Sequence, residues 1–550
     1  MIETLKTFTA LSEEFVELFM KHHPVAATEA GLHDYDLVMP DDTPAGLRER
    51  AAWLRDLEQR LVASVPWDEL PVEARVDFAL LRSRLSTLRA ELEEIRIPQR
   101  VPSLFLERAF MGVHLPLSRT TAPADERKEA AVARLMAIPD YLEGAVANLS
   151  VVPLVMLDAG VELAARGPGF VDDVVRRLLR QFPGEGERLE HAGARARTGF
   201  LRFHDQLDRT LRPAADGGHA LTERWTNFLL EHQYLLSLKA GDIDKLGREE
   251  IVRVRAKLED EARRVDRKRP WRELLAEGRE RHPEANWLRE AYVAEIERAK
   301  RFVTERGLAK LPDGEQIEIV DTPLFMRGRI PHTGYQAPAP FDADLTGCFL
   351  LTPIDVRRDK AAQEHQLRGH CAPLLPLHVL RATYPGEHVR RAAARRAPTR
   401  LRQIANDDVF AHGWTAWAED AMSEQGFFST DPLSPLFRLA GALERASAGV
   451  ADIGLHAGAL SPGEAADLIV HESGCEPAEA EARVRACCVS PLRAATALVG
   501  ATAFRDLHAE ARRRFGDRYD AARFHEALLA GGSIPPELLE EEMWERLGAS

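Results

Sequence analysis

The sequence has few cysteines and lacks the spacings that give cysteines a structural or redox role. Its five cysteines are an odd number and include no C-x-x-C pair, which is not the pattern of a disulfide framework or a zinc finger. The first residues lack the basic and apolar regions of a signal peptide, and no unbroken apolar run approaches the roughly 18 residues of a membrane span. These absences predict a cytoplasmic protein with reduced thiols and no membrane association.

Several common catalytic motifs are also missing. The chain contains no H-E-x-x-H metal motif, no G-x-S-x-G nucleophile elbow, no G-x-x-x-x-G-K-[ST] phosphate loop and no G-x-G-x-x-G dinucleotide fingerprint. The sequence therefore gives no support to a zinc peptidase of the usual kind, a serine hydrolase, a P-loop nucleotidase or a Rossmann enzyme.

Positive charge is in short supply over the chain as a whole. The formal net charge is -14, whereas a nucleic-acid-binding surface needs clustered and uncompensated Lys and Arg. We therefore expect no nucleic-acid partner. The one dense basic run comprises Arg390, Arg391, Arg395, Arg396, Arg400 and Arg402. We predict that this run forms a solvated helix face, with binding of an anionic ligand or partner as the alternative.

Helical periodicity dominates what the sequence does contain. With 550 residues, 45% hydrophobic and 29% charged, the chain is long enough for a sizeable core. Apolar residues recur three and four positions apart through most of it, which predicts long helices. These cover 4–32, 44–64, 72–96, 125–150, 153–165, 170–181, 186–211, 221–237, 247–265, 283–306, 360–382, 402–425, 433–457, 462–470, 477–487, 491–514 and 520–530. We predict a mainly α fold in a single large domain of residues 1–550, with possible lobes 1–310 and 311–550.

One region departs from helical periodicity. Residues 315–319 alternate polar and apolar side chains, and residues 347–351 form a short apolar run. Between them, prolines and glycines stop helices and favour extended or turn conformations. We predict a small β element near 315–351 within a helical protein.

Three histidines precede the most informative segment of the chain. His365, His370 and His378 are separated by intervals of five and eight, which do not place them on one helix face. We interpret them as isolated structural or surface histidines, with a rearranged metal cluster as the alternative.

Three groups of residues carry a resemblance to a known family. Near the N-terminus they are 23–36 with Pro40 and Asp41; mid-chain they are 134–135, 138–142, 148–149, Tyr335 and Pro338; towards the C-terminus they are 491–500, 515–517, 524–529, Gly532 and Pro535. In these segments the chain resembles a bacterial family labelled as a domain of unknown function, DUF885, whose fold is similar to that of carboxypeptidase Taq-type helical metallopeptidases. The resemblance implies a large multi-helix, metallopeptidase-like fold with a deep central cleft.

The chain departs from the family's metal-binding motif, H-E-x-x-P-G-H, at the positions that carry the chemistry. Arg381 stands at the first His, Ala382 at the general-base Glu and Glu387 at the second His, while Pro385 and Gly386 are retained. A guanidinium stays protonated and only donates, so Arg381 cannot bind a metal. Alanine cannot accept a proton, and general-base assistance is worth about 10²–10⁴-fold. We expect the ordinary hydrolytic mechanism to be absent or rebuilt.

A second family motif, E-G-W-x-x-Y-x-E, corresponds to residues 412–419, with His412 at its first Glu. The changes at positions 387 and 412 look reciprocal, because a Glu replaces a His at one and a His replaces a Glu at the other. If the two positions face each other, a Glu/His pair has been exchanged. Further on, Arg493 and Ala497 stand where the family tends to have P-G-Q and a Tyr, which adds a cationic group to the expected cleft.

The first interpretation is a divergent enzyme that works without the usual catalytic zinc. Arg381 would hold an anionic or carbonyl group while Glu387 and His412 divide acid and base roles. The expected reaction is hydrolysis, elimination or cyclisation of a peptide-like or amino-acid-derived small molecule, as the resemblance to peptidases implies. The predicted substrate-binding residues are Tyr335, Tyr384, His388, Glu419, Arg493 and His525. We expect no cofactor, and a monomer or homodimer.

Two other interpretations stay open. A divergent metal-dependent peptidase or amidohydrolase would hold zinc through Glu387, His412 and a third group such as His388, Glu419 or His378, because carboxylate and imidazole both suit that metal. A non-catalytic binding protein would keep the family cleft, with Arg381 and Glu387 forming a structural ion pair.

Overall fold

A computed structural model describes residues 2–119 and 121–548. The protein is mainly helical and contains one small three-stranded sheet, as the sequence predicted. Its contacts divide the chain into two compact units. Unit 1 comprises residues 1–219 with 339–344, and unit 2 comprises residues 220–338 with 345–550.

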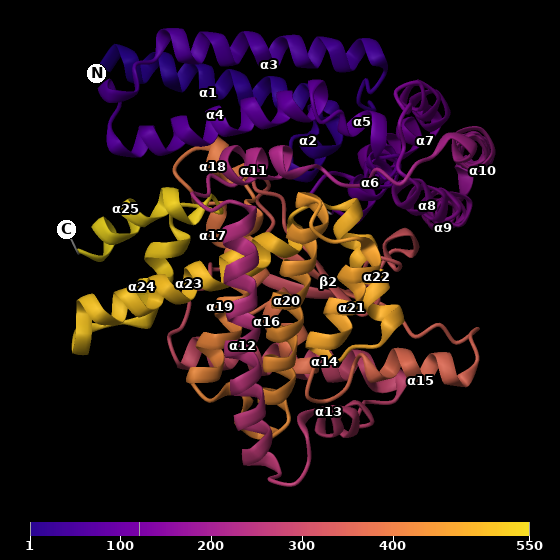
Figure 1. Cartoon of the computed structure of the whole chain (residues 1–550). Helices are drawn as coiled ribbons and strands as arrows, with labels where there is room; N and C mark the ends of the chain where they lie inside the picture. The colour runs from indigo at the N-terminus through magenta and orange to yellow at the C-terminus, as the bar shows by residue number, and fades with distance from the viewer. Residues whose placement is uncertain (1, 120, 549–550) are drawn as a thin grey trace. The chain divides into compact units, whose positions relative to one another are not determined.

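Unit 1 is built from helices that pack along one another. They are α1 (Ile2–His22), α2 (Pro24–Ala30), α3 (Pro44–Ser64), α4 (Val72–Glu93), α5 (Ile97–Arg100), α6 (Ser103–Ser118), α7 (Ala124–Val146), α8 (Leu154–Ala164), α9 (Gly167–Gln181) and α10 (Gly186–Asp205). Helices α1, α3 and α4 lie side by side (Figure 1). Helix α7 packs against α6 on one side and against α10 on another.

Buried polar side chains connect the helices of unit 1. Asp42 is almost fully buried and accepts hydrogen bonds from Arg108 at 2.6 Å, Tyr141 at 2.8 Å and Arg50 at 3.2 Å. Asn148 donates to the backbone carbonyl of Asp42 at 2.6 Å. Burial acts to raise the pKa of Asp42, but the charges of Arg108 and Arg50 outweigh it and lower that pKa. The carboxylate is therefore ionised and holds three partners together, while the Asp42 backbone holds Asn148.

Arg134 is a second buried connection in unit 1. Its guanidinium donates to the carbonyl of Gly112 at 2.8 Å, to Thr28 Oγ1 at 2.7 Å, and to the carbonyls of Tyr35 and Val38 at 3.2 Å. Five donors in a fixed fork suit this task, because backbone carbonyls of a turn would otherwise be buried without partners. The residues around 23–42 and 134–148 that carry the family resemblance thus have structural roles.

Unit 2 holds the remaining elements. They are α11 (Glu223–His232), α12 (Ala240–Val265), α13 (Trp271–Arg279), α14 (Leu288–Glu305), β1 (Gln316–Asp321), β2 (Thr333–Gln336), β3 (Thr346–Leu351), α15 (Lys360–Arg368), α16 (Leu375–Ala382), α17 (Glu387–Ala394), α18 (Arg400–Ile404), α19 (Asp408–Glu424), α20 (Ser434–Ala457), α21 (Pro462–Ser473), α22 (Pro477–Val489), α23 (Arg493–Phe515), α24 (Ala521–Leu529) and α25 (Pro536–Leu547).

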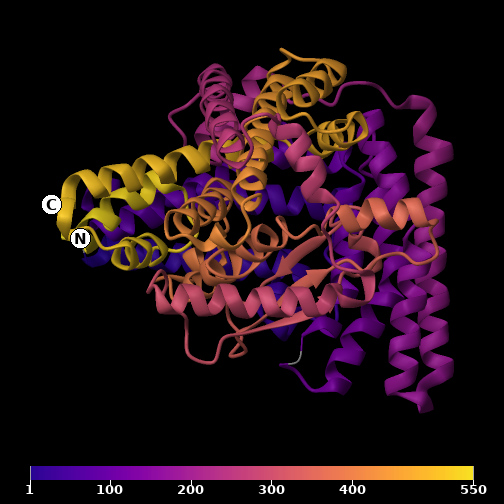
Figure 2. The ribbon, with the colours of Figure 1, turned by 90° about the horizontal axis from the view of Figure 1, so that it is seen from below.

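The small sheet lies where the alternating residues predicted it. Its strand order is β1-β3-β2, with β1 parallel and β2 antiparallel to β3, and Tyr335 on β2 is opposite Phe349 on β3. Helix α14 runs beside the strands (Figure 2). Tyr292 on this helix packs on Phe349 of β3, with ring centroids 5.1 Å apart. Between β2 and β3, residues 339–344 belong to unit 1, where Phe341 donates its N–H to the carbonyl of Ala30 at 3.0 Å.

The core of unit 2 depends on a close crossing of α19 and α23. At Gly500 an added Cβ would lie 2.1 Å from the carbonyl oxygen of Val409, and at Gly413 it would lie 2.8 Å from the Gly500 backbone. No side chain fits at either position without moving a helix. The two glycines therefore set the distance between the helices that carry the predicted site residues.

Several helices differ from the sequence prediction. The predicted helix 360–382 is divided into α15 and α16, and α6, α13, α17 and α25 were not predicted. Helix α6 is buried on most of its surface, so its apolar residues show no single stripe. The units also divide the chain at other positions than the possible lobes 1–310 and 311–550, because α12 packs on α20 and α14 on α16.

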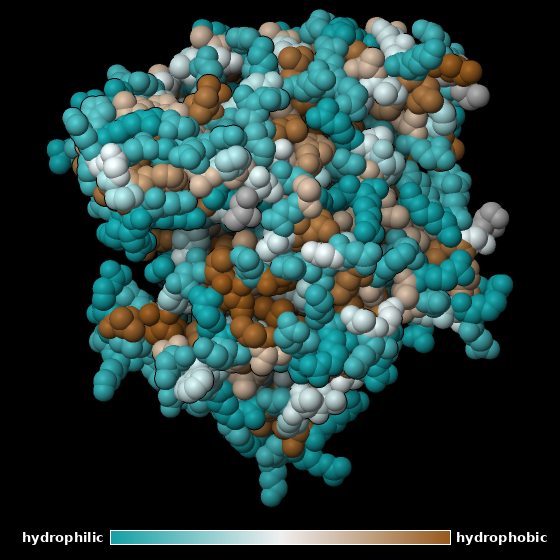
Figure 3. All heavy atoms as spheres, turned by 180° about the vertical axis from the view of Figure 1, so that it is seen from behind, coloured by the Kyte–Doolittle hydropathy of each residue, from teal (hydrophilic) through white to brown (hydrophobic). Residues whose placement is uncertain are grey.

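The face of the molecule shown in Figure 3 is mostly hydrophilic, in keeping with the charged fraction of the chain. In the part of the chain that the structure describes, no single helix is long and apolar enough to cross a membrane. The segments 477–489 and 493–518 reach the required length and composition only as a pair, which is bent by 94°.

Replacing Asp42 tests the buried hub of unit 1. We expect Asp42→Ala to lower the free energy of unfolding by about 3–5 kcal/mol, because Arg50 and Arg108 lose their buried counter-charge. Urea denaturation followed by circular dichroism measures the change. The control is Asp34→Ala at an exposed position of the same unit, and equal stability of the two variants would contradict the role of Asp42.

Candidate functional site

Residues 381–388, which we compared with a metal-binding motif, include a tight turn between two helices. Helix α16 ends at Ala382 and α17 begins at Glu387, with a cis peptide bond between Tyr384 and Pro385. A Cβ on Gly386 would lie 2.0 Å from the carbonyl oxygen of Leu380, so only glycine fits here. The indole N–H of Trp414 on α19 donates to the carbonyls of Pro385 at 2.8 Å and Gly386 at 3.1 Å. The two motifs therefore form one structural unit.

Arg381, which stands at the first His of the family motif, pairs with Glu419. Its Nε lies 2.5 Å from Glu419 Oε1, while Arg445 approaches Oε2 of the same carboxylate at 3.6 Å. Glu419 is only 1% exposed. Burial acts to raise its pKa, but Arg381 and Arg445 outweigh it and lower the pKa below its ordinary value. Arg381 thus neutralises a buried carboxylate, and the ion pair proposed between Arg381 and Glu387 is not the one that forms.

Glu387 is held instead by its neighbour on α17. Arg390 donates from Nε at 3.0 Å and also from Nη2, which makes the contact bidentate. Arg390 is fully buried and also bonds to Ser533 and, at 2.8 Å, to Asn406. Burial acts to raise the pKa of Glu387, but the charge of Arg390 leads the opposing effects and the pKa is lowered. Glu387 is therefore ionised at neutral pH.

His412 lies close enough to Glu387 for each to shift the pKa of the other. Burial lowers the pKa of His412 and Arg493 acts in the same direction, while Asp408 and Glu387 partly oppose them. The imidazole is therefore neutral at neutral pH, and its Nδ1 is buried without a hydrogen-bond partner among the described residues. Arg493 itself is exposed at the start of α23. The structure thus brings together the two positions that look exchanged in the sequence.

His388, Tyr335 and Tyr384 form a separate network around Glu315. His388 is fully buried, with Nε2 2.7 Å from Glu315 Oε2 and Nδ1 2.8 Å from the hydroxyl of Tyr335. Tyr384 donates to Glu315 at 2.5 Å and Lys300 lies 2.7 Å from its other oxygen. Burial acts to raise the pKa of Glu315, but hydrogen bonds from His388, Lys300 and Tyr384 lower it to about 2. These contacts occupy both ring nitrogens of His388, and nothing in the sequence pointed to Glu315.

His525 links two parts of unit 2 through both of its ring nitrogens. Nδ1 lies 2.7 Å from the carbonyl oxygen of Leu308, and Nε2 accepts a hydrogen bond from the indole N–H of Trp417 at 3.0 Å. This pattern assigns the proton to Nδ1 and makes the imidazole neutral. Burial lowers the pKa of His525 in agreement with that assignment. His525 therefore has a bridging role between helix and loop.

The basic run is not the solvated face that we expected. Arg390 and Arg402 are fully buried. Arg390 chelates Glu387, while Arg402 donates to the two oxygens of Glu542 at 2.8 and 2.9 Å. These pairings depend on residues up to 140 positions away, so the local charge pattern could not reveal them.

The residues predicted as alternative metal ligands do not converge. His388 uses both ring nitrogens, and the carboxylate of Glu387 is chelated by Arg390. Over residues 2–119 and 121–548, no group of three or more His, Cys, Asp or Glu side chains is arranged to hold a metal ion. The donor set named from the sequence therefore does not fit zinc in this arrangement.

The histidines before the motif meet at one tyrosine. The hydroxyl of Tyr292 lies 2.9 Å from Nδ1 of His370 and 2.8 Å from Nδ1 of His378, and the ring of His332 lies 5.1 Å from that of His370. His365, by contrast, is exposed. Burial lowers the pKa of His370 to about 3 and of His332 to about 4, and it lowers that of His378 well below the ordinary value. The three buried imidazoles are therefore neutral.

Asp407, which the sequence analysis did not consider, begins α19 directly before the second motif. Its carboxylate accepts the backbone N–H of Phe410 at 2.8 Å and caps the helix. Burial raises its pKa to about 7. Asp407 lies inside the predicted helix 402–425, so the sequence prediction gave no helix start at this position.

Comparison with known families now identifies the chain. The family described as "Bacterial protein of unknown function (DUF885)" matches residues 24–543. The chain belongs to this family. No curated protein matches it. The family description assigns no activity, so the chemistry rests on the residues described above.

Two solved structures are similar to the chain over its full length. A protein from Shewanella oneidensis, described as a "putative lipoprotein of unknown function", has 19% identity and a TM-score of 0.78, with 98% of this chain and 99% of that chain covered. A protein from Colwellia psychrerythraea, described as a "putative lipoprotein", has 16% identity and a TM-score of 0.84, with 100% of both chains covered. At these identities the similarity shows the fold alone.

The buried histidines predict a stability that falls in mild acid. Their folded pKa values lie below about 6.5, so the unfolded chain binds protons that the folded chain does not as the pH falls towards 4. Each such imidazole then lowers the free energy of unfolding by about 1.4 kcal/mol when the pH falls from 7.5 to 5.5. Over this pH range, we expect the free energy of unfolding of His332→Gln to fall by about 1.4 kcal/mol less than that of the unaltered protein. Urea denaturation at both pH values measures the difference.

The matched control is His471→Gln, because the side chain of His471 is 78% exposed. It should leave the pH dependence unchanged. A His332→Gln variant with the pH dependence of the unaltered protein would show that His332 titrates normally in the folded state.

Proposed function

We propose that this protein is a divergent enzyme that acts on an anionic peptide-like or amino-acid-derived small molecule, with His412 as the base that removes a proton. The observation that carries the proposal is a neutral imidazole next to an ionised carboxylate, His412 and Glu387, on two elements joined by Trp414. A neutral imidazole is the form that accepts a proton, and an ionised carboxylate beside it stabilises the imidazolium that forms.

The protonation states favour reactions that begin with proton removal. Glu387 and His412 are both unprotonated at neutral pH, so neither is the acid of the first step. Elimination, cyclisation and base-assisted hydrolysis all meet this condition. Arg493 is exposed and its charge acts on His412, which supports a role for Arg493 in binding a carboxylate or carbonyl oxygen of the substrate. The proposed substrate class rests on the resemblance to carboxypeptidase Taq-type peptidases. We also propose, from the same resemblance, that the protein shares their fold and their central cleft.

A non-catalytic binding protein is the second candidate. The ion pairs Arg381–Glu419 and Glu387–Arg390 favour this candidate. In both pairs, a residue that we predicted to be catalytic makes a contact that also stabilises the fold. In that case the same residues would bind a ligand without transforming it.

The location of the protein has two candidates. The cytoplasm is the location that we first expected, whereas the description of both similar structures as lipoproteins favours a membrane-anchored or secreted protein. Cell fractionation with an antibody against the protein distinguishes the two.

Turnover by two variants tests the catalytic proposal. A panel of dipeptides, N-acyl amino acids and other amino-acid derivatives is screened by mass spectrometry for product formation. On any substrate found, we expect Glu387→Gln and His412→Ala each to lower kcat by about 10²–10⁴-fold, because each removes a group used in proton transfer or its support. Glu481→Gln and His471→Ala, which change exposed side chains of unit 2, are the controls. Full turnover by both site variants would contradict the assignment, and ligand binding without turnover would favour the binding protein.

Metal analysis tests the alternative metal-dependent enzyme. Protein purified without an affinity metal is examined by inductively coupled plasma mass spectrometry, and we expect less than about 0.1 equivalent of zinc, because three free ligands are lacking. One equivalent of a transition metal, lost in Glu387→Gln and in His412→Ala, would show that the ligands rearrange around a metal.

A further inference from the structure

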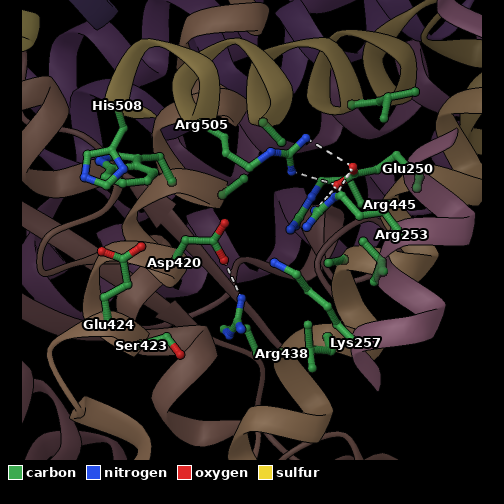
Figure 4. Close-up of a pocket in the computed structure, with 18 residues that line it drawn as sticks. Glu250, Arg253, Lys257, Asp420, Ser423, Glu424, Arg438, Arg445, Arg505 and His508 are labelled. Atoms are coloured by element: carbon green, nitrogen blue, oxygen red, sulfur yellow. Dashed lines mark hydrogen bonds and ion pairs between the residues drawn. The ribbon is translucent and has the colours of Figure 1, made fainter. Parts of the chain in front are cut away.

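Unit 2 contains a pocket that none of the predicted catalytic residues lines. It lies between α12, α19, α20 and α23 and has a volume of about 260 Å³, the space of about nine water molecules at ~30 Å³ each. Figure 4 shows its lining with the charged ends of Lys257, Arg438 and Asp420 pointing into one open space. Its size suits a small molecule.

Positive charge exceeds negative charge in this lining. The cationic residues are Arg253, Lys257, Arg438, Arg445 and Arg505, and the carboxylates are Glu250, Asp420 and Glu424. Five cations against three carboxylates leave an excess of two positive charges, in a chain whose formal net charge is -14. An excess of this sign, within one concave surface, attracts anions.

The ion pairs of the pocket leave this excess in place. Glu250 is shared by two arginines: Arg253 donates to its oxygens at 2.6 and 2.7 Å, and Arg505 donates to them at 2.9 and 3.1 Å. Arg438 pairs with Asp420, and its buried Nε has no hydrogen-bond partner among the described residues. One carboxylate cannot neutralise two guanidinium groups, so the wall formed by Arg253 and Arg505 keeps a net positive charge.

Lys257 is the cation with the fewest compensating contacts. Within the described chain, its ammonium group makes no hydrogen bond or ion pair, although Asp420 attracts it at longer range. Burial and the charges of Arg253, Arg438 and Arg505 all lower its pKa. An anion between these groups would supply the missing counter-charge.

Most of the remaining lining is apolar, with Ser423 and His508 as the polar exceptions. Trp417 packs on His508 with ring centroids 4.3 Å apart, and Val254, Leu439 and Leu498 add aliphatic surface. The indole N–H of Trp417 is already donated to His525, so the ring offers the pocket an apolar face. A ligand with both charge and a carbon skeleton matches this combination better than an inorganic ion.

We propose that this pocket binds a small organic dianion, a molecule with an apolar carbon skeleton that carries two carboxylate groups or one phosphate group. The site goes beyond the proposed function and does not depend on it, because Arg381, Glu387 and His412 are not in its lining. Two anionic groups balance the excess charge, and the ammonium group of Lys257 and the guanidinium of Arg438, which line the same space, provide charge-assisted donors for carboxylate or phosphate oxygens.

Titration calorimetry at constant ionic strength tests the proposal with succinate, glutarate and inorganic phosphate, and with butyrate as a monoanion. We expect at least one dianion to bind about tenfold or more tightly than butyrate, since a second charge-assisted contact is formed. Preference for a dicarboxylate of one length identifies a dicarboxylate ligand, whereas preference for phosphate identifies a phosphorylated one. Equal or absent binding of all four probes overturns the proposal.

Two variants locate the binding. Lys257→Gln and Arg438→Gln should each weaken dianion binding about tenfold, because each removes one charged contact. Lys245→Gln is the matched control: it removes the same charge from the same helix, at a side chain that is 78% exposed. Circular dichroism confirms that each variant is folded. Dianion affinity that is unchanged in both pocket variants, or reduced as much in Lys245→Gln, overturns the assignment to this pocket.

Discussion

The close crossing of α19 and α23 is the constraint on which the rest of unit 2 depends. Gly413 and Gly500 meet where an added Cβ would contact backbone at 2.8 Å or less, so the helices approach more closely than side chains normally allow. One helix carries His412 and Glu419, and the other begins at Arg493. Because helices are rigid over a few turns, this single contact sets where the imidazole, the carboxylate and the cation lie.

Buried carboxylates and arginines extend from this crossing through unit 2. Glu419 is shared by Arg381 and Arg445, and Glu250 is shared by Arg253 and Arg505. A carboxylate inside a protein is stable in its charged form only when cations or hydrogen bonds compensate for the lost water. Arg381 therefore supplies part of the positive charge that keeps the buried carboxylate of Glu419 ionised. This pairing holds Arg381 at the end of α16, just before the turn that contains Pro385 and Gly386.

Much of the fold could be predicted because its signals are local. Amphipathic periodicity located most helices, and the alternation at 315–319 with the apolar run at 347–351 located the sheet. The misses have local causes as well: α6 is buried on most of its surface and shows no stripe, and α17 follows the Pro385–Gly386 turn, whose composition indicates a break. For the candidate site, the motif letters drew attention to positions 387 and 412, whose side chains influence each other's pKa in the structure. These letters could not show that Arg390 makes a bidentate ion pair with Glu387, or that Glu315 forms a hydrogen bond with His388.

The sequence by itself determined the helical character of the chain, the position of its small sheet and its membership of the DUF885 family, because periodicity and motifs are properties of neighbouring residues. Only the tertiary structure decided the protonation states and partners of the charged groups. A pKa depends on burial and on charges brought close by folding, as with Glu419 and the two arginines beside it, which come from different helices. The cationic pocket has the same origin, since its lining residues come from four helices between positions 250 and 508.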